Sequence, residues 1–142
     1  MNSGGAVRTV NIAKGMARLG HDVHILGEGT MNAVHLIQHI QVHELTAAGR
    51  FGHFFNRDFR QILDRLLADE MDLVVVGFPF QAWMVLPLAS RYQVPVVYDA
   101  HNVEVDRFKR MRRPLVAWVV GLAERRLCNA AASVLTVSEE DR

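Results

Sequence analysis

The chain has 142 residues, of which 50% are hydrophobic, 8% aromatic and 22% charged. This composition describes a soluble globular domain, and a chain of this length can bury a core of its own. Its 16 Lys and Arg against 15 Asp and Glu leave a net charge of +1, which excludes the broad basic surface that nucleic-acid binding requires. From its length, we expect the chain to form a single domain over residues 1–142. The one cysteine, Cys128, excludes an internal disulfide, so we expect the protein in the reducing cytoplasm.

The chain begins with an expected helix followed by an expected strand. Gly4 and Gly5 precede a segment whose apolar residues recur at helical spacing, and Gly20 marks the end of that segment. Residues 22–27 then form a short segment of β-favouring side chains, with Val23 and Ile25 on one face. This composition predicts the first strand.

A second strand is expected from Val34 to Val42, because apolar residues occupy most of the even positions there. His35, His39 and His43 occupy odd positions and would share the opposite face. Three histidines invite comparison with a metal site. However, they lie four residues apart and no acid completes a His-Glu-x-x-His pattern, so we expect an exposed polar strand face and no metal.

Helices and strands alternate through the second half of the chain. Asn56 is a suitable N-cap for a helix that ends near Leu67. The expected elements that follow are a strand at 72–77, a helix at 81–92, a strand at 96–98, a helix at 115–131 and a strand at 133–137. This alternation predicts an α/β protein with a Rossmann-like parallel sheet and helices on both faces, in three layers.

The most informative polar residues follow the strand expected at 96–98. Ligands of open parallel sheets bind beyond the carboxyl ends of the strands, and there the chain carries Asp99, His101, Asn102 and Glu104. Such groups can hydrogen-bond sugar hydroxyls, and His101 can change its charge near neutral pH. The same residue types also serve as turn and cap residues, so residue types alone leave both interpretations open.

Gly4 and Gly5 form the second candidate site. The free N–H groups and the positive dipole end of a helix start attract phosphate. The sequence has neither G-x-G-x-x-G nor a Walker A motif, so no dinucleotide or P-loop cofactor is predicted. Two glycines in a flexible terminus would look the same.

A basic cluster lies beside these candidates. Arg107, Lys109, Arg110, Arg112 and Arg113 place five positive charges within seven residues. They could steer a diphosphate, an anionic acceptor or a lipid surface. Most such runs are simply solvated loops.

The chain carries, in this order, Gly4-Gly5, Gly20-His21-Asp22-Val23, Asp99-Ala100-His101-Asn102-Val103-Glu104, Glu124 and the run from Ala131 to Ser138. Taken in this order, the motifs resemble the N-terminal, acceptor-side domain of retaining GT-B glycosyltransferases of family 4.

The resemblance implies transfer of a sugar from a nucleotide-sugar donor to a sugar, lipid or other hydroxyl acceptor, with no further cofactor. By motif, Gly4–Gly5 would approach the donor diphosphate. His101 would face the transferred sugar as the catalytic residue. Asp99, Asn102 and Glu104 would shape the sugar-binding wall of the cleft.

The sequence departs from the family pattern at both ends. The family begins with an apolar strand directly before the Gly-Gly loop, whereas Met1, Asn2 and Ser3 stand there. We therefore expect a sheet of order 3-2-1-4-5 without its first, central strand, and a true start upstream. The family also continues beyond Arg142 into a second domain, so we expect this fragment to need that domain, or a separate donor-binding chain, for activity.

The alternative is a non-catalytic Rossmann-like or flavodoxin-like binding module that shares only the architecture, because a fold does not fix a function.

Overall fold

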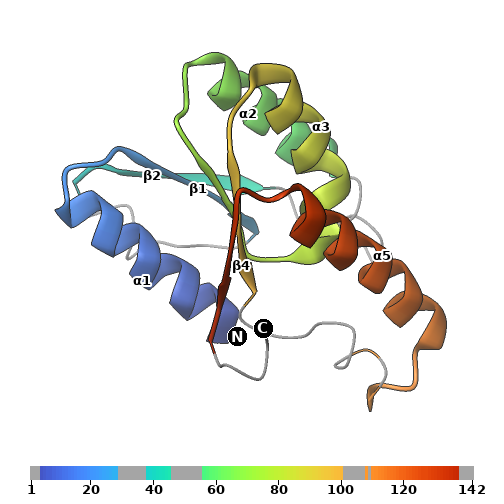
Figure 1. Cartoon of the computed structure of the whole chain (residues 1–142). Coiled ribbons are helices and arrows are strands. Elements are labelled where there is room, and N and C mark those ends of the chain that lie inside the picture. The colour runs from blue at the N-terminus through green and yellow to red at the C-terminus, as the bar shows by residue number, and fades with distance from the viewer. Residues whose placement is uncertain (1–3, 29–37, 46–55, 101–107, 109, 138–142) are drawn as a thin grey trace. The chain divides into compact units, whose positions relative to one another are not determined.

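A computed structural model of the chain describes residues 4–28, 38–45, 56–100, 108 and 110–137. The chain forms two compact units, Met1–Arg50 and Phe51–Arg142, and each is described by itself. Both units combine helices with parallel strands (Figure 1). The α/β class expected from the sequence is confirmed.

The first unit contains one helix and two strands. Helix α1 spans Gly4–Arg18, strand β1 spans Val23–Glu28 and strand β2 spans Ile40–Leu45. The strands pair in parallel, with Val23 opposite Ile40.

Gly20 ends α1 as its sequence position predicts. Its φ of 88° lies in the left-handed region, where a side chain is strained. The Gly20 N–H donates to the Ala17 carbonyl at 3.0 Å, and the His21 N–H donates to the Met16 carbonyl at 3.2 Å. This pair of bonds is a Schellman motif, and it satisfies carbonyls that the helix end would otherwise leave open.

The core of the first unit lies between α1 and one face of the two strands. Two small side chains of the helix let it approach the sheet closely. The buried residues are Ala13, Ala17, Ile25 and Ile40, with Val10, Val23 and Val42 packed around them.

The second strand differs from the one expected at 34–42. Residues 29–37 lie outside the described part of the chain, and Gln38 and His39 form a turn. His39 has a φ of 67°, which no strand residue adopts, and its carbonyl accepts a bond from the Val23 N–H at 2.8 Å. The strand therefore begins only at Ile40, and the alternating pattern predicted its start several residues too early.

The second unit holds the remaining elements in the order that the sequence predicts. They are α2 (Arg57–Ala68), β3 (Val74–Val76), a 3₁₀ turn η1 (Pro79–Gln81), α3 (Ala82–Tyr92), β4 (Val96–Ala100), α5 (Pro114–Ala130) and β5 (Ser133–Thr136). Asn56 caps α2 as predicted, because its side-chain oxygen accepts a bond from the Phe59 N–H at 3.1 Å.

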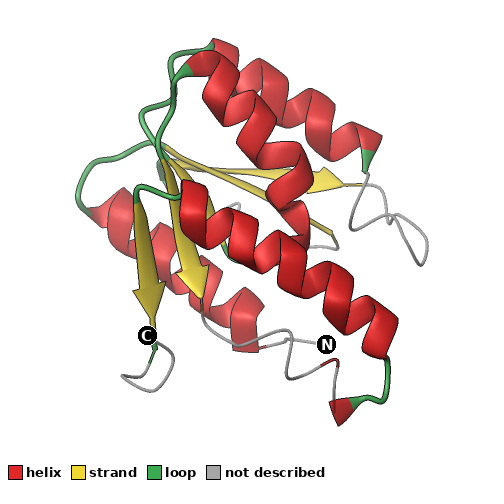
Figure 2. Ribbon diagram, turned by 45° about the vertical axis from the view of Figure 1, so that its right-hand side comes forward, coloured by secondary structure: helices red, strands yellow, loops and turns green. Residues whose placement is uncertain are grey.

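The core of the second unit lies under α5, which packs against α3, η1 and β4 (Figure 2). The three strands are parallel in the order β3-β4-β5. Tyr98 in the middle strand is only 1% exposed, and Leu127 of α5 is fully buried. The middle strand, β4, therefore lies in the core of the second unit.

The described strands form two parallel sheets, β1-β2 and β3-β4-β5, rather than one. Parallel strands and helices that follow one another along the chain are the Rossmann-like pattern that the sequence predicts.

Candidate functional site

Asp99 lies inside β4 rather than after it. The strand was expected to end at Tyr98, but its pairing with β5 continues through Asp99, opposite Leu135, and Ala100, opposite Thr136. The Asp99 side chain is 2% exposed. A buried carboxylate needs polar partners, so Asp99 is part of the structure of the strand end whatever else it binds.

The next three candidates, His101, Asn102 and Glu104, lie outside the described residues. Their roles stay predictions. The structure does describe where their segment begins, because Ala100 is the last residue of β4 and lies level with the last residue of β5. The segment therefore leaves the carboxyl edge of the sheet, the edge at which α/β proteins bind ligands.

Gly4 and Gly5 are the first two residues of α1, so the helix begins at the glycines and not after them. Gly5 is buried, and its carbonyl accepts a bond from the Thr9 hydroxyl at 3.0 Å. The first turn contains no acidic residue that would repel an anion. The helix start therefore suits a phosphate electrostatically.

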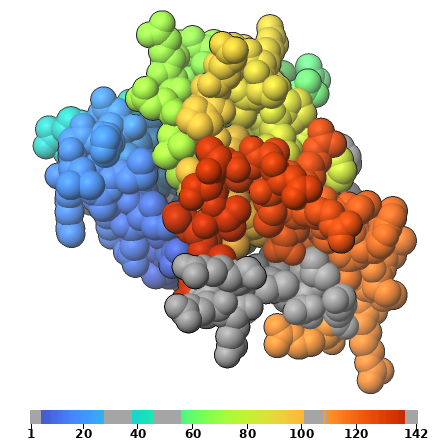
Figure 3. Space-filling model, viewed as in Figure 1, coloured from blue at the N-terminus to red at the C-terminus, as the bar shows by residue number. Residues whose placement is uncertain are grey.

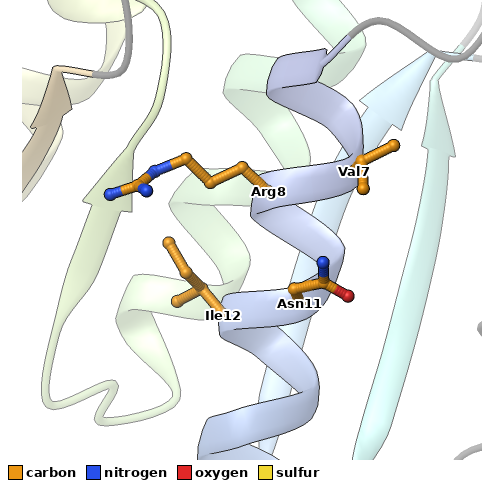
Figure 4. Close-up of a pocket in the computed structure, with 4 residues that line it drawn as sticks. All are labelled: Val7, Arg8, Asn11 and Ile12. Atoms are coloured by element: carbon orange, nitrogen blue, oxygen red, sulfur yellow. The ribbon is translucent and has the colours of Figure 1, made fainter. Parts of the chain in front are cut away.

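The sequence did not single out Arg8, which lies in the first turns of the same helix. An open depression of about 480 Å³ is lined by Val7, Arg8, Asn11 and Ile12 (Figure 4). Arg8 and Ile12 project to one side of the helix, and Val7 and Asn11 to the other. A positive charge within one turn of the glycines could have been found by reading the i+3 and i+4 positions.

Two histidines meet across the strands of the first unit. His24 Nδ1 lies 2.9 Å from His43 Nε2. The ring planes differ by 13° and the ring centres are 5.1 Å apart, so the rings meet edge to edge and one N–H donates to the other ring's nitrogen. Burial and the neighbouring His24 lower the pKa of His43, which favours the neutral ring that this bond requires.

The prediction that the histidines share one exposed strand face is therefore wrong for His39 and His43. His39 is in the turn, where its Nδ1 lies 2.9 Å from Asp22 Oδ1, and His43 is half-buried against His24. Among the residues described, no three His, Cys, Asp or Glu side chains gather as metal ligands do.

Cys128 is not an activated nucleophile. The thiol is exposed, but partial burial and then the charge of Glu124 raise its pKa. The thiolate is therefore disfavoured at neutral pH.

Parallel strands connected through helices define a Rossmann-like α/β protein. The model of the family described as Glycosyltransferase Family 4 matches residues 2–142. The chain belongs to this family, whose chemistry is glycosyl transfer. Comparisons with curated proteins and with solved structures each found no match.

Proposed function

We propose that this chain forms the acceptor side of a retaining glycosyltransferase that moves a sugar from a nucleotide-sugar to a hydroxyl acceptor. The observation that carries the proposal is the family match over residues 2–142. The glycine start of α1 and the polar residues that follow β4 in the sequence support it.

The donor diphosphate binds at the start of α1. Gly4 and Gly5 have no side chains to obstruct a phosphate, and the helix start supplies N–H groups and a positive dipole end. Arg8 follows these glycines by four and three residues, so the helical repeat puts its charge on their side of the helix. An arginine forms two parallel bonds to phosphate oxygens, which no neutral side chain can do.

In the transfer step, the bond between the anomeric carbon and the diphosphate oxygen breaks. The acceptor oxygen bonds to the same carbon with retained configuration, and the acceptor proton passes to the leaving diphosphate. Negative charge grows on that diphosphate as the bond breaks, so the cationic helix start lowers the barrier. His101, which follows β4 in the sequence, contacts the transferred sugar, and Asn102 and Glu104 shape the sugar-binding wall.

The test of donor binding is calorimetric titration with nucleoside diphosphates and nucleotide-sugars. Arg8→Gln should lower the affinity for a nucleoside diphosphate roughly 10-fold, on the scale of one charge-assisted hydrogen bond. Lys14→Gln is the matched control, because it removes one charge from the same helix away from its start. Equal losses in both variants would assign the effect to general charge and remove the diphosphate site.

We also expect the 142-residue chain alone to bind the donor weakly and to transfer no sugar. Its described residues offer one phosphate-binding element, and tight nucleotide binding needs several groups. Transfer to an acceptor by the purified chain alone would contradict this. Binding of a nucleotide with no preference for the attached sugar, and with no transfer in any assembly, would favour a non-catalytic binding module.

A further inference from the structure

Helix α5 has two apolar faces, and only one of them is buried. The face toward α3, η1 and β4 holds small and aliphatic side chains: Ala117, Val120, Ala123 and Leu127. On the other face, Leu115 is 74% exposed, Trp118 is 64% exposed and Leu122 is 40% exposed. These three residues are spaced by three and four, so they form one stripe on the side of the helix away from the core.

Figure 3 shows the first half of α5, in orange, at the surface of the second unit. Exposing a leucine and a tryptophan to water in one stripe is unfavourable, because apolar surface is more stable when it is removed from water. Single exposed apolar residues need no explanation, but a contiguous stripe marks an interaction surface.

Positive charge gathers at the N-terminal end of the same helix. Arg110, Arg112 and Arg113 are exposed directly before α5, and Met111 among them is 50% exposed. Residues 110–130 include five arginines and a single acid, Glu124. The carboxylate of Glu124 accepts a hydrogen bond from the buried Tyr98, so it lies toward the core rather than on the exposed stripe.

We propose that the exposed face of α5 and the arginines before it dock this protein onto an anionic lipid surface. The helix lies in the plane of the interface, with Leu115, Trp118 and Leu122 at the boundary between headgroups and acyl chains. Arg110, Arg112 and Arg113 contact lipid phosphates. Tryptophan suits this depth because its ring is apolar while its N–H can bond to polar groups.

Charge complementarity favours lipid over a protein partner. The surface combines one apolar stripe with a cluster of a single sign, which is the combination that interfacial helices use. Insertion of the apolar stripe alone, or attraction of the arginines alone, gives marginal and reversible binding to lipid. Together the two contributions give stable attachment. No described helix is long and apolar enough to cross a membrane.

The experiment is flotation of the full chain with vesicles of phosphatidylcholine alone or mixed with phosphatidylglycerol. The protein should float only with the anionic vesicles, and added salt should weaken the binding. This measurement involves no sugar transfer, so its outcome is independent of the proposed enzymatic function. Failure to float with anionic vesicles at low salt would overturn the proposal.

Paired variants separate the apolar contribution to vesicle binding from the electrostatic one. Leu115→Ser with Trp118→Ser should lower the vesicle partition at least 10-fold, whereas Leu19→Ser with Leu73→Ser, at exposed leucines elsewhere, should leave it unchanged.

Arginine variants test the electrostatic contribution. A triple change of Arg110, Arg112 and Arg113 to Gln should lower the partition on the order of 100-fold, because each arginine near an anionic surface is worth about 5-fold. The same triple change at the exposed Arg57, Arg60 and Arg65 of α2 should have little effect. Equal losses in the two triple variants would overturn the proposal.

Tryptophan fluorescence reports the depth of the helix. In a Trp83→Phe background, Trp118 is the one remaining tryptophan, and its emission should shift to the blue with anionic vesicles but not with neutral ones. If Leu115→Ser with Trp118→Ser instead turns a lipid-free dimer into a monomer, the stripe is a contact between two copies and the proposal is wrong. Circular dichroism checks that each variant folds, and if the serine pair does not, the arginine variants decide.

Discussion

The Tyr98 hydroxyl on β4 donates a hydrogen bond to Glu124 Oε1 on α5 at 2.9 Å. Tyr98 is among the largest fully buried side chains of the second unit, so this hydrogen bond lies in its core. The bond ties the middle strand to the long helix one residue before Asp99. Glu124, which the family resemblance marked by sequence alone, therefore has a structural role.

Glu124→Ala should lower the free energy of unfolding by about 1–3 kcal/mol, because it removes the carboxylate that accepts the hydrogen bond of the buried Tyr98 hydroxyl. Glu124→Gln keeps an oxygen acceptor of the same shape and should lose less than half as much. Urea unfolding followed by circular dichroism measures both. Equal losses in the two variants would show that packing, and not the hydrogen bond, is what Glu124 contributes.

Substitution by alanine should change the free energy of unfolding in opposite directions at Gly15, inside α1, and at Gly20, just after its end. Gly20 has a φ of 88° and open space where a Cβ would stand, so Gly20→Ala should destabilise by about 1 kcal/mol through backbone strain alone. Gly15 lies inside the helix with equally open space, so Gly15→Ala should stabilise by about 0.5–1 kcal/mol. Thermal unfolding of both variants checks the difference, and a loss at Gly15 would mean that the helix does not continue through it.

The His24–His43 pair should make the first unit less stable in acid. Burial, and then the charge of His24, lower the pKa of His43 from its ordinary 6.5. The unfolded chain therefore takes up the proton first as pH falls, so this stabilisation is present above about pH 6.5 and is lost below it.

Unfolding measured between pH 8 and pH 5 tests the histidine pair, and His43→Gln should flatten the pH dependence over that range. Because burial is the larger cause, added salt should leave most of the effect in place. A pH dependence that disappears in high salt would assign it to surface charges instead.

His101→Ala should lower kcat/KM by roughly 10²-fold or more in the active enzyme, on the scale of losing one polar group that stabilises the transition state. Its circular dichroism and unfolding should stay those of the parent, because the loss is of a contact to the sugar and not of core packing. Undiminished transfer, or loss of activity together with unfolding, would make His101 a structural residue.

The candidate site could be read from the sequence only in part. The order of motifs identified the family and pointed to the segment after β4, because those residue types stand at the end of an apolar strand. It did not show that Asp99 is buried within the strand, since that depends on how far β5 pairs alongside. Arg8 was missed because the helix was expected to begin after Gly4 and Gly5, whereas α1 begins at them and its repeat brings Arg8 to their side.

The sequence by itself determined the alternation of helices and strands, the cap at Asn56 and the helix end at Gly20. Each of these depends on hydrogen bonds between residues only a few positions apart. Tertiary structure alone decided where β2 begins, that His24 meets His43, and that Leu115, Trp118 and Leu122 face away from the core. Those outcomes depend on which distant segments pack together, and the local pattern is the same whichever of two apolar helix faces the core covers.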